Sequence, residues 1–474
     1  MRILSLTILL TAVLPGIQLR SPQDPGVLAI RNVTVVPGDG SPSLPAQTVV
    51  IRGERIAAIG PADQTQVPAG AVEVDGTDRF LMPGLIDLHV HLSKTRGSAL
   101  GLFVASGVTT VRDMGGEFEE LLRWRREIGA GTRLGPRMLI AGPYLESARN
   151  IARMRKDPPE SRVEPFERAR IPVGSPAEAR RIVAELASRE VDFLKIRTVE
   201  NDETYRALNE AAQAHGLRLV GHVYGLSPKL VLDAGQDGID HNFYPSLAGT
   251  REERMAVWRA FAARGVPCVP TLVTFFEATF PPVEHLKAVV EDEAGRVDPR
   301  RAYLSRFLVL DWREQVEEAT PERTGTLRRV YNEVVRRDLR EMHEAGMDIL
   351  AGSDNAVLNI FPDSIHEELL LMAREVGLTP MEIIARSTSR AAAFLGLGDS
   401  IGTVKRGKTA DLLLLDADPT LDIANTRRIS NVFVRGRHYG SRELDALREA
   451  ARNAEDRRVN DWPRVKGGQA PKGA

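Results

Sequence analysis

The middle of the chain alternates short apolar runs with segments of helical periodicity. The first runs are GLIDLHV, GVTTVRDM, RMLIAG and VDFLKI, and RLVGHV, GIDH, VPCVPTL and MDILAGSD follow. Segments such as SPAEARRIVAELASRE lie between them, with apolar residues spaced as on one face of a helix. Eight strands separated by helices predict an α/β fold, a parallel (β/α)8 TIM barrel over residues 82–396.

The two ends of the chain carry a different pattern, in which short strand-like runs alternate with turn residues. These runs are VLAIRNVTVV and TVVIRGERIAAIG near the start, and TADLLLLDADP and ISNVFVRGR near the end. We predict that both ends together form one small composite β-sandwich domain, residues 26–81 and 397–440. Residues 441–474 are predicted as a charged C-terminal tail that begins as a helix.

Two connections within the barrel region are unusually long. One covers residues 144–172 and is rich in Arg and Glu, and the other follows Thr271. Long insertions in a barrel usually form active-site loops, and we predict this role for both.

The chain begins with an uncharged apolar run, ILSLTILLTAVLPG, after Arg2. This run is too short to span a bilayer comfortably. It predicts a signal peptide over residues 1–22 and an exported protein, periplasmic or secreted. A buried N-terminal strand is the alternative. No later segment has the pattern of a membrane span.

Composition narrows the classes of partner. The chain has 474 residues and a net charge of −1, with acidic and basic residues mixed throughout. The absence of a basic stripe argues against a nucleic-acid partner. Cys268 is the one cysteine, which excludes an internal disulfide and a zinc site built from cysteines.

Residues with metal-binding chemistry fall at the carboxyl ends of the predicted strands, where barrel active sites lie. Because side chains alternate along a strand, Asp87, His89 and His91 share one face, and two imidazoles on one face can hold a metal ion. Later strands end in Lys195, His222, His241 and Asp354. A satisfied core histidine is the alternative for each one singly, but such histidines would not fall so regularly on strand ends.

Several of these segments carry a family resemblance. They are PGLIDLHVHL, GVTTVRDMGG, DFLKI, GHVYG, DGIDH and AGSDN, together with IGTVKRGKTADLLLLDADP from the returning β-domain. The chain resembles the amidohydrolase superfamily, and within it the imidazolonepropionase-like group that includes metal-dependent Xaa-Pro dipeptidases. The resemblance covers nearly the whole chain after residue 22.

The resemblance implies a site for two divalent metal ions. The ligands implied are His89, His91 and Asp354 for the more buried ion, and His222 and His241 for the second. Lys195 would take up carbon dioxide, and its carboxylated side chain would bridge both ions as an anionic ligand. Zn²⁺ is the expected metal because imidazole-rich sites suit it, although other divalent ions fit the same ligands.

The implied reaction is amide hydrolysis. A hydroxide bridging two ions about 3.5–4 Å apart would attack the carbonyl carbon. Asp354 would act as general base and then as general acid. Tyr224 shares the strand parity of His222 and is a candidate donor to the developing oxyanion, with packing at the rim as the alternative.

The substrate is less well defined. Dipeptidase-like relatives often carry Thr-Gly-Gly-His after the third strand, whereas this chain has GPYLESARNIARMRKDPPE. Arg149 and Arg153 are candidates for binding a substrate carboxylate, with a solvated helix face as the alternative. Arg197 and His366 are further candidate substrate contacts, although helix packing is the alternative for His366.

These observations predict a hydrolase of a C–N amide bond in a small peptide (dipeptidase- or prolidase-like) or an N-acyl amino acid. A cyclic amide or a xenobiotic amide is the alternative substrate, because one fold and site serve many substrates. A noncatalytic binding protein on the same scaffold is the alternative of a different class. The resemblance is also compatible with a homo-oligomer.

Overall fold

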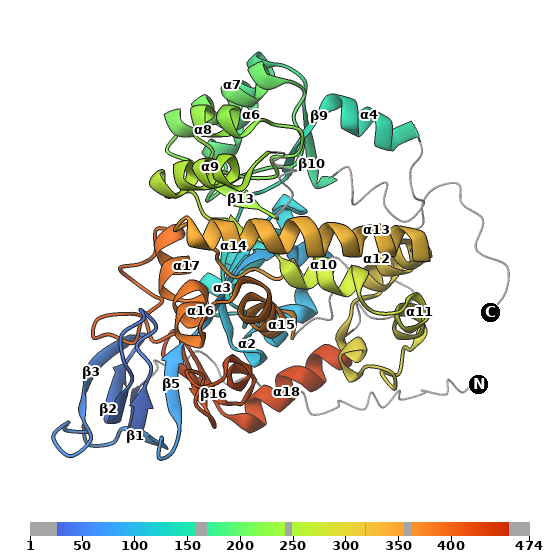
Figure 1. Ribbon diagram of the computed structural model, residues 1–474. Coiled ribbons are helices and arrows are strands. Elements are labelled where there is room, and N and C mark those ends of the chain that lie inside the picture. Colours follow the sequence, from blue (N-terminus) through green and yellow to red (C-terminus); the bar gives the residue numbers. More distant parts are fainter. Residues whose placement is uncertain (1–25, 157–167, 242–248, 318, 355–362, 455–474) are drawn as a thin grey trace, which may run out of the picture.

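A computed structural model describes residues 26–156, 168–241, 249–317, 319–354 and 363–454. The predicted signal peptide, residues 1–22, and the end of the predicted C-terminal tail lie outside these residues. Figure 1 shows the helical body of the molecule with a small β-sheet at its lower left.

The middle of the chain forms two parallel sheets. One is β6 (Leu85–Val90), β7 (Val108–Asp113) and β8 (Arg137–Ile140). The other has the order β10 (Arg170–Val173), β9 (Tyr144–Ser147), β11 (Leu194–Ile196), β12 (Leu219–Gly221), β13 (Gly238–Asp240) and β14 (Cys268–Val269). Seven of the eight predicted strand segments thus contain a strand, and the α/β prediction is confirmed.

Scattered backbone hydrogen bonds, rather than continuous strand ladders, join the two sheets. On one side the Asp192 N–H donates to the Ile140 carbonyl (3.0 Å), and on the other the Leu88 N–H donates to the Ala351 carbonyl (3.1 Å). Ile349, in the eighth predicted strand, makes only an isolated bridge to Cys268. The fold is therefore of TIM-barrel type, but its strand ladders do not run as one continuous closed barrel among the described residues.

Helices follow the strands and cover them. They include α3 (Phe118–Gly129), α6 (Pro176–Ser188), α7 (Asp202–Ala214), α8 (Pro228–Ala234), α9 (Arg251–Ala263), α14 (Arg336–Glu344), α15 (Ser364–Leu371), α16 (Pro380–Ser387) and α17 (Ser389–Phe394). Several of these helices begin at residues that the sequence marks as helix starts. Ser175, for example, accepts a hydrogen bond from the Glu178 N–H and Pro176 takes the first helical position, so α6 begins there.

The two long connections contain regular elements, which corrects the prediction that they are loops. The first contains β9, α4 (Ala148–Lys156) and β10, and β9 pairs with β11. The second contains α10 (Leu272–Thr279), α11 (Val283–Glu291), α12 (Arg306–Glu317) and α13 (Pro321–Val330). Strands β9 and β10 have only four residues each, which is too short to stand out in a search for apolar runs.

Strands from both chain ends pair with each other. They are β1 (Val27–Val35), β2 (Leu44–Arg52), β3 (Arg55–Pro61), β4 (Val72–Asp75), β5 (Phe80–Pro83), β15 (Leu412–Leu415), β16 (Ile429–Val434) and β17 (Arg437–Tyr439). They form one eight-stranded sheet rather than the two sheets of the predicted sandwich. The strands stay in one sheet because β1 pairs with β2, β4 and β5. Two register shifts between β1 and β2 allow this sheet to bend around a hydrophobic core of its own.

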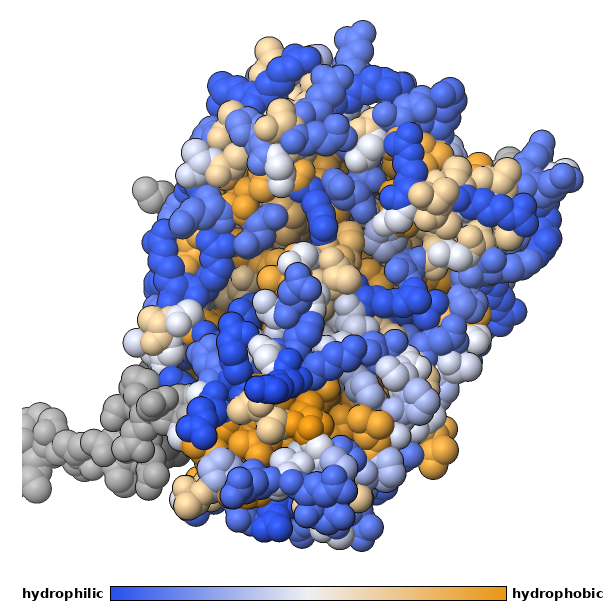
Figure 2. Space-filling model, turned by 90° about the vertical axis from the view of Figure 1, so that its left-hand side faces the viewer, coloured by the Kyte–Doolittle hydropathy of each residue, from blue (hydrophilic) through white to orange (hydrophobic). Residues whose placement is uncertain are grey.

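The predicted tail begins as helix α18 (Ser441–Arg452), which packs against α2 (Leu100–Ala105) and buries Leu444. In the part of the chain that is described, every helix is too short or too polar to cross a membrane. On the face shown in Figure 2, hydrophilic side chains cover most of the surface and hydrophobic ones show mainly in the recesses between them.

Candidate metal centre

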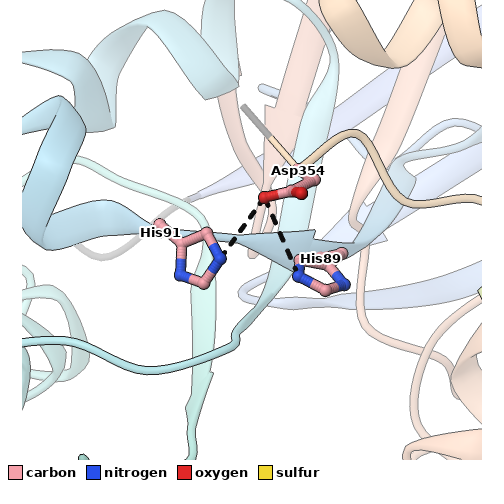
Figure 3. A group of neighbouring side chains, drawn as sticks. All are labelled: His89, His91 and Asp354. Carbon is pink, nitrogen blue, oxygen red and sulfur yellow. Dashed lines mark ion pairs between the residues drawn. The ribbon is translucent and has the colours of Figure 1, made fainter. Parts of the chain in front are cut away.

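His89, His91 and Asp354 lie together at the carboxyl ends of their strand segments (Figure 3). All three residues are buried, with exposures of 1%, 7% and 5%. One ligand atom from each lies within 4.8 Å of the others. The Asp354 Oδ1 atom is 3.3 Å from His91 Nε2 and 3.8 Å from His89 Nε2. The structure therefore brings together three residues that are up to 265 positions apart in the chain.

Asp87 fixes the backbone of both ligand segments. Its Oδ1 accepts hydrogen bonds from the main-chain N–H groups of His89 (3.1 Å) and Ser353 (2.9 Å), and its Oδ2 accepts one from the Ser353 hydroxyl (2.6 Å). Asp354 follows in a left-handed conformation (φ 47°), which ends the extended segment and turns its side chain toward the histidines. Asp87 thus acts on the ligands through the main chain rather than through an imidazole ring.

His222 and His241 complete a row of histidine rings. Ring centroids lie 4.7 Å apart for His89 and His241, and 4.9 Å apart for His222 and His241. His241 also has a left-handed backbone (φ 66°), and its Nδ1 lies 2.7 Å from the Thr271 hydroxyl oxygen. Lys195, from β11, is 1% exposed.

A close approach of β12 to β11 positions His222. Its N–H donates to the Ile196 carbonyl (3.0 Å), and Gly221 beside it has φ 133°. A Cβ at Gly221 would lie 2.1 Å from the Ile196 oxygen, so only glycine fits this contact.

The protonation states suit metal binding. Burial lowers the pKa of His89 to about 3 and that of His241 to about 4, and it holds the pKa of His222 well below the usual range. Burial alone would raise the pKa of Asp354, but the neighbouring histidines outweigh it and keep that pKa well below its usual range. Near neutral pH these three histidines are therefore neutral imidazoles and Asp354 is an ionised carboxylate, which are the forms that bind metal ions.

The residues present fit one divalent ion directly. Two ligand atoms about 2.1 Å from a tetrahedral Zn²⁺ lie about 3.4 Å apart, close to the Asp354–histidine separations. A second ion fits under one condition. The Lys195 Nζ atom lies 3.1 Å from Asp240 Oδ2, and an unmodified lysine offers no anionic oxygen, so the second site needs the carboxylated side chain.

Three residues at the site escaped the sequence analysis. Asp240 contacts Lys195 and Arg112, and the Tyr144 hydroxyl lies 2.9 Å from His91 Nδ1. Arg112 is 2% exposed. The sequence signal that could have identified it is an arginine inside the apolar run GVTTVRDM, because arginine is rarely buried without a partner. Asp240 carried no comparable signal, because strand parity places only one of Asp240 and His241 on the inner face.

The predicted substrate-binding residues lie in different surroundings. Tyr224 is 40% exposed, with its ring centroid 4.7 Å from that of His222. Arg197 lies 3.4 Å from Glu146 Oε2. Arg149 is 78% exposed and pairs with Glu200, and the exposed Arg153 donates to Asn150 Oδ1 (3.0 Å).

His366 corrects one prediction. It is 2% exposed, and its ring nitrogens lie 2.9 Å from the Thr426 hydroxyl and 3.0 Å from the Ser106 carbonyl. Both nitrogens are used within the fold, so His366 packs a helix and does not contact a substrate.

A TIM-barrel-type fold with a buried His-His-Asp group defines the class to which this protein belongs, that of barrel proteins with a metal-binding site at the strand ends. The chain belongs to the amidohydrolase family, whose model matches residues 80–438. This match confirms the resemblance found in the sequence, and the family uses divalent metal ions.

Individual relatives agree with this assignment. The imidazolonepropionase of Thermoplasma volcanium is 30% identical over 115 residues, which cover 24% of this chain and 27% of that protein. The matched segment thus spans about a quarter of the length of this curated relative. A protein assigned as a prolidase from Bifidobacterium longum has 25% identity and a TM-score of 0.65, covering 90% of this chain and 100% of that one. A Xaa-Pro dipeptidase with bound methionine has 20% identity and a TM-score of 0.63, covering 88% and 100%, and this likeness shows the fold alone.

Proposed function

We propose that this protein is a binuclear metal-dependent hydrolase of C–N amide bonds. The observation that carries the proposal is the buried group of His89, His91 and Asp354, with the rings of His222 and His241 extending from it. Divalent ions held there would supply a Lewis acid for the carbonyl oxygen and would lower the pKa of water. Family membership supports the reaction class.

Residues of the chain itself transfer the proton and stabilise the oxyanion in this proposal. Asp354 is ionised and 5% exposed, so it accepts a proton from the attacking water and returns it to the leaving nitrogen. Tyr224, at the rim beside His222, donates a hydrogen bond to the developing oxyanion. Burial lowers the pKa of His89, His222 and His241 and keeps these three side chains neutral, so they stay ligands rather than proton carriers.

Lys195 carries a carboxylate in this proposal. Burial lowers its pKa, although Asp240 opposes the effect, and a neutral amine is the form that reacts with carbon dioxide. The product is an anionic oxygen ligand in a place where two cations require one. Zn²⁺ is the metal we propose, because neutral imidazoles dominate the ligand set.

The proposed substrate is a dipeptide or an N-acyl amino acid. Support comes from the relative assigned as a prolidase, which matches over its whole length. Arg197, which directly follows β11, is the candidate for a substrate carboxylate, because its side chain is only partly exposed, whereas Arg149 and Arg153 are exposed on α4. A cyclic amide is the second candidate, favoured by the similarity to an imidazolonepropionase.

We also propose that the protein is exported through residues 1–22. Support is the apolar run that follows Arg2 in the sequence.

Turnover of a pooled substrate library tests the reaction. Zinc-loaded protein is incubated with dipeptides and N-acyl amino acids, and their depletion is followed by mass spectrometry. Depletion by the wild type and not by Asp354→Asn is the expected result, and the depleted members identify the side-chain preference. A variant of the same segment, Asp348→Asn, serves as control because Asp348 pairs with Arg390 away from the ligands. No depletion by zinc-loaded wild type would contradict the proposed substrate class.

A further inference from the structure

Asp240, the last residue of β13, faces two candidate metal ligands at once. Its Oδ2 lies 3.1 Å from Lys195 Nζ, and its Oδ1 lies 3.5 Å from His89 Nδ1. The same Oδ1 accepts a hydrogen bond from Arg112 Nη2 at 2.7 Å. The Asp240 side chain is 1% exposed, so these contacts form without competition from solvent. One carboxylate thus connects a ligand from β6 with a ligand from β11.

Arg112 is held rigidly in this arrangement. Its Nε donates to the Leu88 carbonyl (2.6 Å), so the guanidinium is also tied to the strand that carries His89. Its guanidinium carbon lies 5.5 Å from the ring centre of Phe193 and 5.3 Å from that of Phe394. Two aromatic faces and a main-chain acceptor leave the side chain a single orientation, and its charge compensates that of Asp240.

We propose that Asp240 is a positioning residue that orients Lys195 and His89 for metal binding, with Arg112 as its fixed counter-ion. The inference rests on the proposed function, in which Lys195 is carboxylated. In that reaction the neutral amine nitrogen forms a bond to the carbon of carbon dioxide, one C=O π bond breaks to leave an anionic oxygen, and one N–H proton passes to solvent water. The nitrogen keeps its other hydrogen, which donates to Asp240 Oδ2.

This hydrogen bond fixes the direction of the new carboxylate. Because a carbamate N–H lies in the plane of its two oxygens, a hydrogen bond from this N–H to Asp240 would fix that plane, and the oxygen anti to the N–H would lie on the side away from Asp240. On the other side, an Nδ1–H directed at Asp240 Oδ1 leaves the His89 Nε2 lone pair for an ion. The Asp240 carboxylate therefore fixes both the orientation of the carboxylated Lys195 and the tautomer of His89.

Two measurements that do not involve turnover test the inference. The carbamate carbon is followed by NMR after supply of ¹³C-bicarbonate with zinc, and zinc affinity is measured by competition with a chelator. In Asp240→Asn one of the two carboxylate oxygens becomes an NH₂ group. This group must face either Arg112 or Lys195, and that residue, itself a hydrogen-bond donor, then loses its acceptor. We expect loss of the carbamate signal and a zinc Kd raised by about 10–100-fold.

Two further variants separate this role from simple structural damage. Arg112→Lys keeps the charge but loses the fixed fork, and we expect a reduced carbamate signal in a folded protein. Asp338→Asn removes a carboxylate that is also buried, paired with Arg337 in α14 at 2.7 Å, and we expect it to keep the carbamate and the zinc affinity of the wild type.

A double-mutant cycle with Lys195→Ala completes the test. If Asp240 acts partly through Lys195, Asp240→Asn costs less zinc affinity in the Lys195→Ala background than in the wild type. Equal costs in both backgrounds, or an unchanged carbamate signal in Asp240→Asn, would overturn the inference alone. A zinc-loaded wild type without any carbamate would overturn both the inference and the proposed modification of Lys195.

Discussion

The main-chain N–H of Asp354 donates a hydrogen bond of 2.7 Å to the carbonyl oxygen of His89. The two residues thereby meet through their backbones as well as through their candidate ligand atoms, which lie 3.8 Å apart. Because Asp87 also holds the N–H groups of His89 and Ser353, the first and last ligand segments form one hydrogen-bonded unit. The position of Asp354 is thus set by the strand that carries the histidines.

Tyr224→Phe tests the proposed oxyanion donor. Removal of one such donor typically lowers kcat by about 10²-fold, and KM should change little if the contact forms mainly in the transition state. Steady-state kinetics on a substrate found in the library experiment measure both. Tyr205→Phe is the matched control, because its hydroxyl donates to Gln236 (2.8 Å) inside the fold. An unchanged kcat in Tyr224→Phe would remove the tyrosine from the mechanism.

The raised pKa of the buried Glu368 predicts that the stability of the protein falls as the pH rises. Burial raises its pKa to about 8, and its Oε2 accepts the Val273 N–H (2.7 Å) at the start of α10. The folded state therefore holds a proton that the unfolded state releases above pH 4.5, its ordinary value. This contribution to stability is fully present below pH 4.5 and is lost as the pH rises through about 8.

Glu368→Gln removes that dependence. The amide resembles the protonated acid and retains an oxygen for the Val273 N–H, so we expect the variant to fold. Urea unfolding between pH 5 and pH 9 should show a smaller loss of stability in Glu368→Gln than in the wild type. Parallel pH curves for the two proteins would show that the carboxyl is ionised in the folded state.

Gly221→Ala tests the close contact that positions His222. The added Cβ would lie 2.1 Å from the Ile196 oxygen, at a φ of 133° that alanine disfavours. We expect a loss of about 1–3 kcal/mol in the free energy of unfolding and weaker binding of the second zinc ion. Gly216→Ala is the control, with positive φ but nothing within 4 Å of the added carbon. Equal zinc binding in Gly221→Ala and wild type would contradict the role of this contact.

Strand alternation in the sequence predicted much of the site. The pattern of GLIDLHVHL placed His89 and His91 on one face, and the later apolar runs ended at residues that the structure gathers beside them. The local pattern was sufficient there because successive side chains of a strand alternate between its two faces.

The rest of the site depends on backbone geometry and distant contacts. Asp240 and His241 are adjacent, so strand parity places only one of them inward, yet the left-handed backbone of His241 (φ 66°) lets both side chains reach the site. Arg112 meets Asp240 across 128 positions of chain, which no local pattern reports. Strands β9 (YLES) and β10 (RIPV) were missed because each is only four residues long, and polar or charged residues shorten its apolar part further.

Zinc stoichiometry tests the central claim most directly. Purified protein is loaded with zinc and bicarbonate, freed of excess metal, and its zinc content is compared with that of His91→Asn and His222→Asn. The account predicts two zinc ions per chain in the wild type, and the loss of one ion when either histidine is replaced. A wild type that holds one ion, and keeps it unchanged in His222→Asn, would contradict the binuclear site.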